Sequence, residues 1–119
     1  MVDTVGTVPQ LNFERRRGDT YPFVLQLRDA AGAALDITGC TFLLTIDPSP
    51  TPADASANVA QLTGSIVGAA TNGQVQFTPT APAVGTVGVL FYDVQMTTSG
   101  GAVRTVLAGQ WTVSQDVTK

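Results

Sequence analysis

The feature that most constrains this chain is an alternation of apolar and polar residues with a period of two, broken by clusters of Gly, Pro, Asn and Asp. Such alternation sends successive side chains to opposite faces of a strand and predicts strands that are buried on one face. Helical periodicity is nearly absent. The pattern predicts seven strands, over residues 10–15, 22–28, 40–46, 59–67, 74–78, 87–97 and 103–113. Short strands separated by turn signals are typical of an all-β, immunoglobulin-like antiparallel β-sandwich of about seven strands.

A chain of 119 residues has the size of one domain. We expect that domain to span residues 1–119, with a loose amino-terminal arm at 1–8 and a short carboxyl-terminal tail at 114–119. Hydrophobic residues make up 44% of the chain and charged residues 13%, which argues against intrinsic disorder.

Several segments read as turns and loops. Residues 16–19, 29–32 and 99–101 carry turn residues, and Asn72-Gly73 is a dipeptide favoured in tight hairpins. Residues 47–58 contain Pro48, Pro50 and Pro52. Prolines at alternate positions cannot join a hydrogen-bonded ladder, so we expect an exposed loop there. The connection between Pro79 and Pro82 has room for one helical turn.

The composition argues against an enzyme. The chain has no His, which removes the commonest general base and the commonest metal ligand. Cys40 is the single cysteine, so no disulfide can form within the chain, and a nucleophilic role would need a base that His does not supply. We interpret Cys40 as a buried packing residue. No catalytic, cofactor or metal site is predicted.

The charge is mildly acidic. Lys plus Arg number 6 and Asp plus Glu number 9, for a formal net charge of -3. This balance has no electrostatic signature of a nucleic-acid or anionic-membrane partner. No apolar run approaches the roughly 18 residues of a membrane span. The first residues lack the basic and apolar regions of a signal peptide, so we expect synthesis and retention in a cytosol.

Three segments are candidate contact sites for a protein partner: an arginine turn, a proline loop and the amino-terminal arm at 1–8, which would order by adding a strand to the sheet edge of a neighbour. Arg15, Arg16 and Arg17 concentrate half of the positive charge in one turn with Asp19, although a solvated turn remains the simpler interpretation. Arg17-Gly18-Asp19 also matches an adhesion tripeptide, which needs an extracellular loop tip and is not favoured. The second candidate is the proline loop and its flanking carboxylates: Asp47, Pro48, Pro50, Pro52 and Asp54.

Three carboxylates are candidates for calcium binding or acid catalysis. Asp47 and Asp54 flank the proline loop and are candidates for sharing a calcium ion, but they lack the dense oxygen ligands of such sites. We interpret both as solvated. Asp93 has no identifiable partner carboxylate or base, and we expect it to face outward.

The aromatic residues leave a glycan-binding module open as an alternative. Such a module needs aromatic rings aligned on one exposed face, and Tyr21, Phe91, Tyr92 and Trp111 are the candidates. Buried core aromatics are commoner in a domain of this size, so a glycan partner is not favoured.

Motifs across most of the chain resemble a domain of tailed phages. The first half contains Arg17-Gly18-Asp19-Thr20, then 23–29 (Phe-Val-Leu-Gln-Leu-Arg-Asp), Gly32 and 35–39 (Leu-Asp-Ile-Thr-Gly). The second half contains 91–97 (Phe-Tyr-Asp-Val-Gln-Met-Thr), a Gly turn, a strand and Asp116-Val117-Thr118. Together, residues 13–118 are similar to the amino-terminal domain of baseplate upper proteins and related tail-fibre attachment domains.

The resemblance implies a non-enzymatic structural protein of a tailed-phage virion, in the baseplate, tail or fibre-attachment region. It implies assembly in the host cytoplasm, contacts with other virion proteins, and several copies or a homo-oligomer. Baseplate upper proteins continue into a fibre-like region that binds the receptor-binding protein. The present sequence stops before such a region, so we expect an adaptor rather than a direct receptor-binding role. A capsid decoration or head-fibre protein is the alternative within the virion.

Overall fold

The computed structural model describes residues 10–117. In that range eight strands and three short 3-10 helices follow one another. The strands are β1 (Phe13–Arg16), β2 (Phe23–Gln26), β3 (Thr41–Asp47), β4 (Ala60–Thr63), β5 (Ser65–Ile66), β6 (Gln74–Phe77), β7 (Gly88–Thr97) and β8 (Val103–Ser114). The 3-10 helices are η1 (Ala55–Ala57), η2 (Ala70–Asn72) and η3 (Pro82–Val84). The helical turn expected between Pro79 and Pro82 forms later than predicted, because η3 begins at Pro82.

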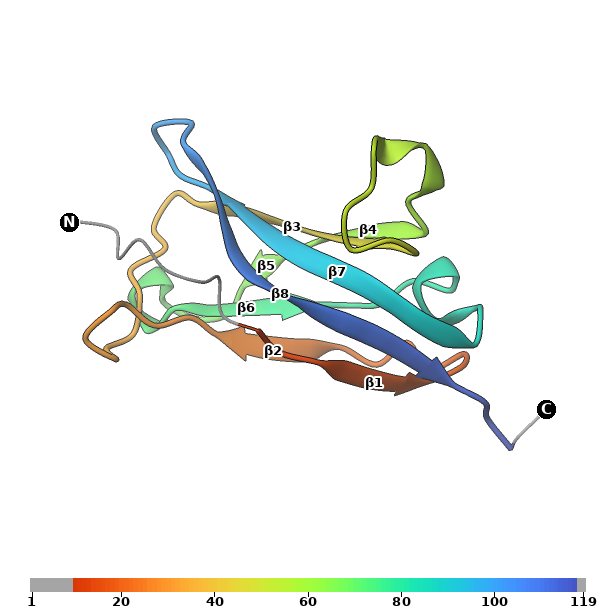
Figure 1. The fold of residues 1–119 in the computed structure, drawn as a ribbon. Helices are drawn as coiled ribbons and strands as arrows, with labels where there is room; N and C mark the ends of the chain where they lie inside the picture. Colours follow the sequence, from red (N-terminus) through yellow and green to blue (C-terminus); the bar gives the residue numbers. More distant parts are fainter. Residues whose placement is uncertain (1–9, 118–119) are drawn as a thin grey trace.

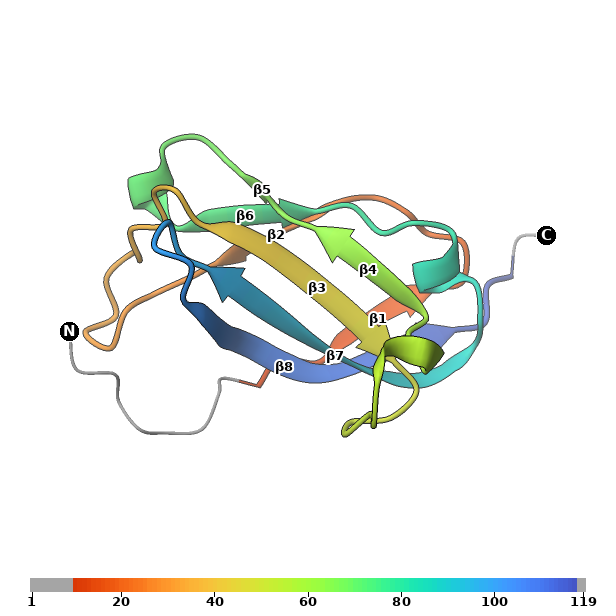
Figure 2. The ribbon, with the colours of Figure 1, turned by 90° about the horizontal axis from the view of Figure 1, so that it is seen from above.

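The strands form two layers, which Figures 1 and 2 show from the front and from above. One sheet has the order β1-β8-β7-β3-β4, and the other has the order β2-β6-β5. This arrangement confirms the predicted all-β, immunoglobulin-like sandwich. One pairing departs from a wholly antiparallel design, because β1 runs parallel to β8, with Phe13 opposite Trp111.

The structure has eight strands where the sequence predicts seven, because residues 59–67 divide between the sheets. β4 pairs with β3 in the larger sheet, and β5 pairs with β6 in the smaller one. The chain changes sheet at Gly64. An added Cβ there would lie 2.6 Å from Val75 Cγ1 and 2.9 Å from Phe42 Cβ, so only glycine fits this crossing.

The core lies between the inward faces of the two sheets. Strand alternation sends Leu44 and Ile46 of β3, and Tyr92, Val94 and Met96 of β7, into it, as the period-two pattern predicts. An aromatic cluster joins the layers, and it consists of Phe13, Phe23, Phe77, Tyr92 and Trp111.

The connections follow the turn chemistry of the sequence, with one difference. The 29–32 turn closes through the Gly32 N–H, which donates to Asp29 O at 3.0 Å, and the β7–β8 hairpin turns at Gly101, which has a φ of +91°. At Asn72-Gly73 the predicted tight hairpin is wrong in detail. Here β5 and β6 are joined by a longer connection that contains η2 and ends at Gly73 in a left-handed conformation.

The predicted arm at residues 1–8 lies outside the described residues, as do residues 118 and 119 of the predicted tail. Ser114, the first tail residue, is the last residue of β8. Within residues 10–117 the structure has no helix with the length and apolarity of a membrane span.

Candidate interaction surface

The predicted arginine turn forms, and it ties the first strand to the exit of the last strand. The Asp19 N–H donates to Arg16 O at 3.0 Å, and Gly18 has a φ of +87°. Arg16 Nη1 donates to the Gln115 carbonyl at 3.1 Å, and Arg17 forms an ion pair with Asp116 at 3.1 Å. Both side chains therefore contact the segment that follows β8.

Arg15 is a correction to the predicted contact set. Its exposed fraction is 4%, because the alternation of β1 places its side chain on the buried face of the strand. Its guanidinium carbon lies 4.0 Å from the centre of the Tyr21 ring and 4.9 Å from that of Phe23. Arg15 Nη1 also donates to Tyr21 O at 2.9 Å. The prediction that Arg15 is a surface contact is wrong, since it packs as part of the domain.

The proline loop is exposed as predicted at Pro48, Pro50 and Pro52. Asp54 is also exposed and caps η1, because its Oδ1 accepts from Ser56 N–H at 2.9 Å and from Ser56 Oγ at 2.6 Å. These hydrogen bonds, the side-chain one first, lower the pKa of the Asp54 carboxyl. Asp54 is thus engaged in local structure.

Asp47 is a second correction. The sequence suggests a solvated carboxylate, but its exposed fraction is 4%. Oδ1 accepts from the Ser49 N–H at 2.9 Å, while the buried Oδ2 has no hydrogen-bond partner among the described residues. The physical reason is the path of the loop: it folds back from the end of β3, so that Pro50 and Pro52 stand beside Asp47.

Asp47 lines a small hollow on the outer face of the larger sheet. The hollow has a volume of about 140 Å³. Asp47 is paired with Phe91, and the neighbouring Thr45 is paired with Asp93, so the two carboxylates share this face on adjacent strands. Its lining comprises Thr45, Asp47, Ser49, Pro50, Pro52, Phe91, Tyr92, Asp93, Thr105 and Ala108. Burial raises the pKa of the Asp93 carboxyl.

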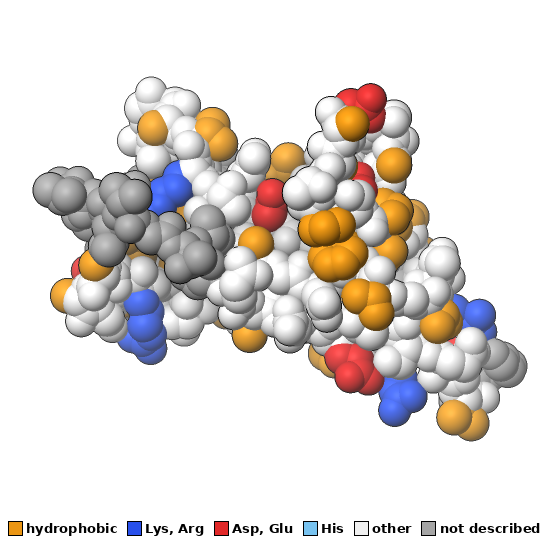
Figure 3. All heavy atoms as spheres, viewed as in Figure 1, with side chains coloured by type: hydrophobic (Ala, Val, Ile, Leu, Met, Phe, Trp, Pro, Cys, Tyr) orange, Lys and Arg blue, Asp and Glu red, His pale blue; other side chains and the backbone are white. Residues whose placement is uncertain are grey.

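An apolar stripe leads from this hollow toward the start of β7. Val87 and Val89 are 45% and 53% exposed, and Phe91 continues the same outward face. In Figure 3 hydrophobic side chains gather over the right half of the view, next to the projecting proline loop. The alternation of β7 predicts which of its residues face inward, but it does not identify the outward valines as a contact site. The sequence signal that identifies them is a valine at positions where the alternation of the strand favours a polar residue.

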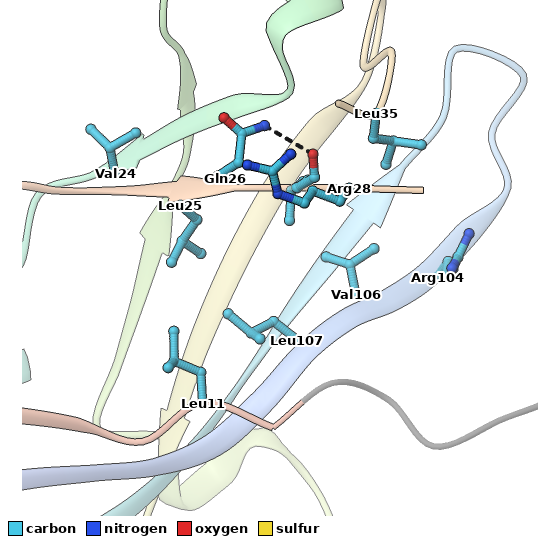
Figure 4. Close-up of a pocket in the computed structure, with 10 residues that line it drawn as sticks. Leu11, Val24, Leu25, Gln26, Arg28, Leu35, Arg104, Val106 and Leu107 are labelled. Atoms are coloured by element: carbon cyan, nitrogen blue, oxygen red, sulfur yellow. Dashed lines mark hydrogen bonds between the residues drawn. The ribbon is translucent and has the colours of Figure 1, made fainter. Parts of the chain in front are cut away.

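A second hollow of about 270 Å³ opens between β2 and β8, where β1 no longer covers β8. Figure 4 shows Leu11, Leu25 and Leu107 pointing toward one another inside it, while Val24 points away. Arg28 and Arg104 are among its lining residues.

The structure buries two of the four aromatic residues considered for glycan stacking. Trp111 is fully buried and its Nε1 donates to the Ala83 carbonyl at 2.9 Å. Tyr92 is buried, and its hydroxyl donates to the Leu11 carbonyl at 2.5 Å. Burial raises the pKa of Tyr92 well above its usual range. Tyr21 is exposed but stacks with Arg15 at the other side of β1.

Cys40 is half-buried against the core, rather than fully buried, and desolvation raises the pKa of its thiol. Across residues 10–117, no three His, Cys, Asp or Glu side chains gather in a group that could hold a metal ion.

Comparisons with known proteins show no family for this chain. No protein-family model matches the chain, and no curated protein matches it. Among solved structures, the chain is similar to CopC from Methylosinus trichosporium OB3b, with 14% identity over 88% of each chain and a TM-score of 0.45. At that level of identity the similarity concerns the β-sandwich alone.

Proposed function

We propose that this protein is a non-enzymatic structural component of a tailed-phage virion, an adaptor of the baseplate, tail or fibre-attachment region. The observation that carries a contact role is an apolar stripe beside the proline loop, formed by the exposed Val87 and Val89 and the half-buried Phe91. Apolar side chains grouped on a surface mark places where a protein binds another protein. The phage assignment rests on the resemblance of residues 13–118 to baseplate upper protein domains.

The build of the domain suits a rigid block. Five aromatic rings join the two sheets, and the ion pair between Arg17 and Asp116 holds the first turn against the exit of β8. A rigid block loses little conformational entropy when it binds, so a modest apolar stripe suffices for a contact repeated in many copies.

The test of the virion assignment is a copy count by quantitative mass spectrometry on purified particles from the source lysate. We expect a copy count in small multiples of three or six that remains with isolated tails, the outcome that a symmetric ring in the tail would give. A count in the hundreds that follows the capsid would support the decoration alternative instead. Absence of the chain from particles would overturn the virion proposal.

The test of the surface compares two exposed valines. Val89→Lys places a charge in the stripe, and Val24→Lys places one on the outer side of β2, where Val24 is 49% exposed. We expect Val89→Lys to lower incorporation into particles at least about tenfold, which corresponds to roughly 1.4 kcal/mol. We expect Val24→Lys to incorporate normally. Loss with Val24→Lys alone would assign the contact to the other sheet.

A further inference from the structure

We propose that the hollow between Asp47 and Asp93 accepts an arginine side chain from a partner protein. This inference rests on the proposed function, because it names the chemistry of a partner that binds next to the apolar stripe. It concerns a site of about 140 Å³ on the larger sheet, under the proline loop.

The first argument is a buried carboxylate oxygen that has no hydrogen-bond partner. Asp47 is 4% exposed, and its Oδ2 has no hydrogen-bond partner among the described residues. A buried acceptor without a partner is costly and is rare in native proteins. Asp93 lines the same hollow and is partly desolvated, which raises the pKa of its carboxyl. No Lys or Arg occurs among the described residues that line the hollow. A cation from outside would satisfy both groups.

The second argument is the shape and chemistry of the walls. The volume is similar to that of a cavity of about 150 Å³ that holds benzene, so a planar guanidinium fits. Phe91, Pro50 and Pro52 are among the lining residues, and an aromatic ring suits a flat cation that stacks on it. The same chain already packs a guanidinium in this manner, since Arg15 lies 4.0 Å from the centre of the Tyr21 ring.

The third argument separates arginine from a metal ion. Calcium takes six to eight oxygen ligands, whereas this hollow offers two carboxylates and a few hydroxyls between apolar walls. Arginine carries five N–H donors in a fixed fork, so one guanidinium can donate to both carboxylates. Asp93 lines the hollow as it stands, whereas Asp47 Oδ2 is covered, so the guanidinium reaches that oxygen only when the proline loop shifts.

The experiment titrates the ¹⁵N-labelled full chain with N-acetyl-arginine amide and follows the backbone amides by NMR. We expect saturable shifts at Thr45, Ser49, Phe91 and Asp93, with a dissociation constant on the order of 1 mM for so small a ligand. N-acetyl-citrulline amide has nearly the same shape without the charge, and we expect it to bind at least about tenfold more weakly. Shifts at Ser49 and Thr51 would report movement of the loop.

The variants are Asp93→Asn and Asp47→Asn, with Asp54→Asn as a control that removes one charge from the same loop outside the hollow. We expect each of the first two to weaken binding at least about tenfold and the control to leave it unchanged. Equal binding of the arginine and citrulline probes, or equal loss in all three variants, would overturn the inference. Calcium chloride that saturates the same signals at lower concentration than arginine would overturn it in favour of a metal site.

Failure of this inference can be told from failure of the proposed function. The titration uses the purified chain and two small molecules, whereas the copy count uses particles. If the chain binds arginine but is absent from particles, the arginine site is supported and the virion role is rejected. If the chain is counted in tails but does not bind arginine, the virion role is supported and the arginine site is rejected.

Discussion

Individual residues in this domain take their properties from their place in a strand rather than from their chemical type. Arg15 and Arg16 are neighbours in β1, yet Arg15 is buried against aromatic rings and Arg16 is exposed. Asp47 and Asp54 flank one loop, yet Asp47 is buried and Asp54 caps a helical turn in solvent. Neighbouring residues of one type in a strand therefore differ in burial, because successive side chains point to opposite faces of the strand.

The first prediction concerns Arg15. Arg15→Ala removes the hydrogen bond to the Tyr21 carbonyl and the stacking on Tyr21 and Phe23. We expect the free energy of unfolding to fall by about 2 kcal/mol, measured by urea denaturation. Arg16→Ala is the control, and at this exposed position we expect a change within about 0.5 kcal/mol. Equal losses in the two variants would contradict the burial of Arg15.

The second prediction concerns the cost of the charge on Asp93. Burial raises the pKa of its carboxyl, so the folded state binds the proton more tightly than the unfolded state. Stability from this group is then fully present below the unfolded pKa of about 3.9 and is lost as the pH rises through the folded pKa. Asp93→Asn cannot ionise, so we expect a higher Tm than the parent at neutral pH.

The measurement is thermal unfolding of both proteins across the acidic range. The advantage of Asp93→Asn should shrink as the pH falls below about 3.9, where the parent carboxyl is protonated in both states. A difference in Tm that is independent of pH would show that ionisation is not its cause. Greater stability together with loss of arginine binding would show that the carboxylate serves binding at the expense of folding.

At the scale of elements, the decisive feature is the place where one predicted strand becomes two. β4 ends at Thr63 and β5 begins at Ser65, and the residue between them carries the chain from one sheet to the other. The pairing of the first and last strands is a second decisive feature. They run parallel, and the Tyr92 hydroxyl holds the Leu11 carbonyl at the point where the chain enters β1.

The third prediction concerns this crossing. Gly64→Ala would bring a Cβ within 2.6 Å of Val75 Cγ1 and 2.9 Å of Phe42 Cβ, so the two sheets must move apart locally. We expect a loss of about 2 kcal/mol in the free energy of unfolding. Gly100→Ala is the matched control, because its nearest atom, Thr98 Oγ1, is 4.0 Å away. At that position we expect a change within about 0.5 kcal/mol. A neutral Gly64→Ala would contradict the tight crossing.

At the scale of the whole molecule, the aromatic cluster makes the two sheets one cooperative unit. Phe23 of the smaller sheet contacts Phe13 and Trp111 of the larger one, with ring centres 4.8 Å and 5.9 Å apart. Neither sheet can then lose its packing without exposing rings of the other. The contact surface proposed above lies outside this core, on the solvent face of the larger sheet.

The fourth prediction concerns that cooperativity. Trp111 is the single tryptophan of the chain and is fully buried between the sheets, so its fluorescence reports the core. We expect urea unfolding followed by tryptophan fluorescence and by far-ultraviolet circular dichroism to give coincident transitions, as a two-state domain requires. Separate midpoints for the two signals would indicate that one sheet unfolds before the other.

The sequence by itself determined the fold class, most strand positions and most turns. It did so because alternation and turn residues act over a few neighbours, and Gly18, Gly32 and Gly101 take the positive φ that their turns require. It also placed Asp93 on an outward face, since period two is enough to assign a face.

Only the tertiary structure decided where the chain changes sheets, that β1 runs parallel to β8, and which charged side chains are buried. The first two depend on residues far apart in the chain, Gly64 on Phe42 and Phe13 on Trp111, and the burial of Asp47 depends on the path of the loop that follows it. A local pattern carries no information on such pairs. The hollow exists because the proline loop folds back beside the strand that precedes it, and the alternation of the strand carries no signal of that path.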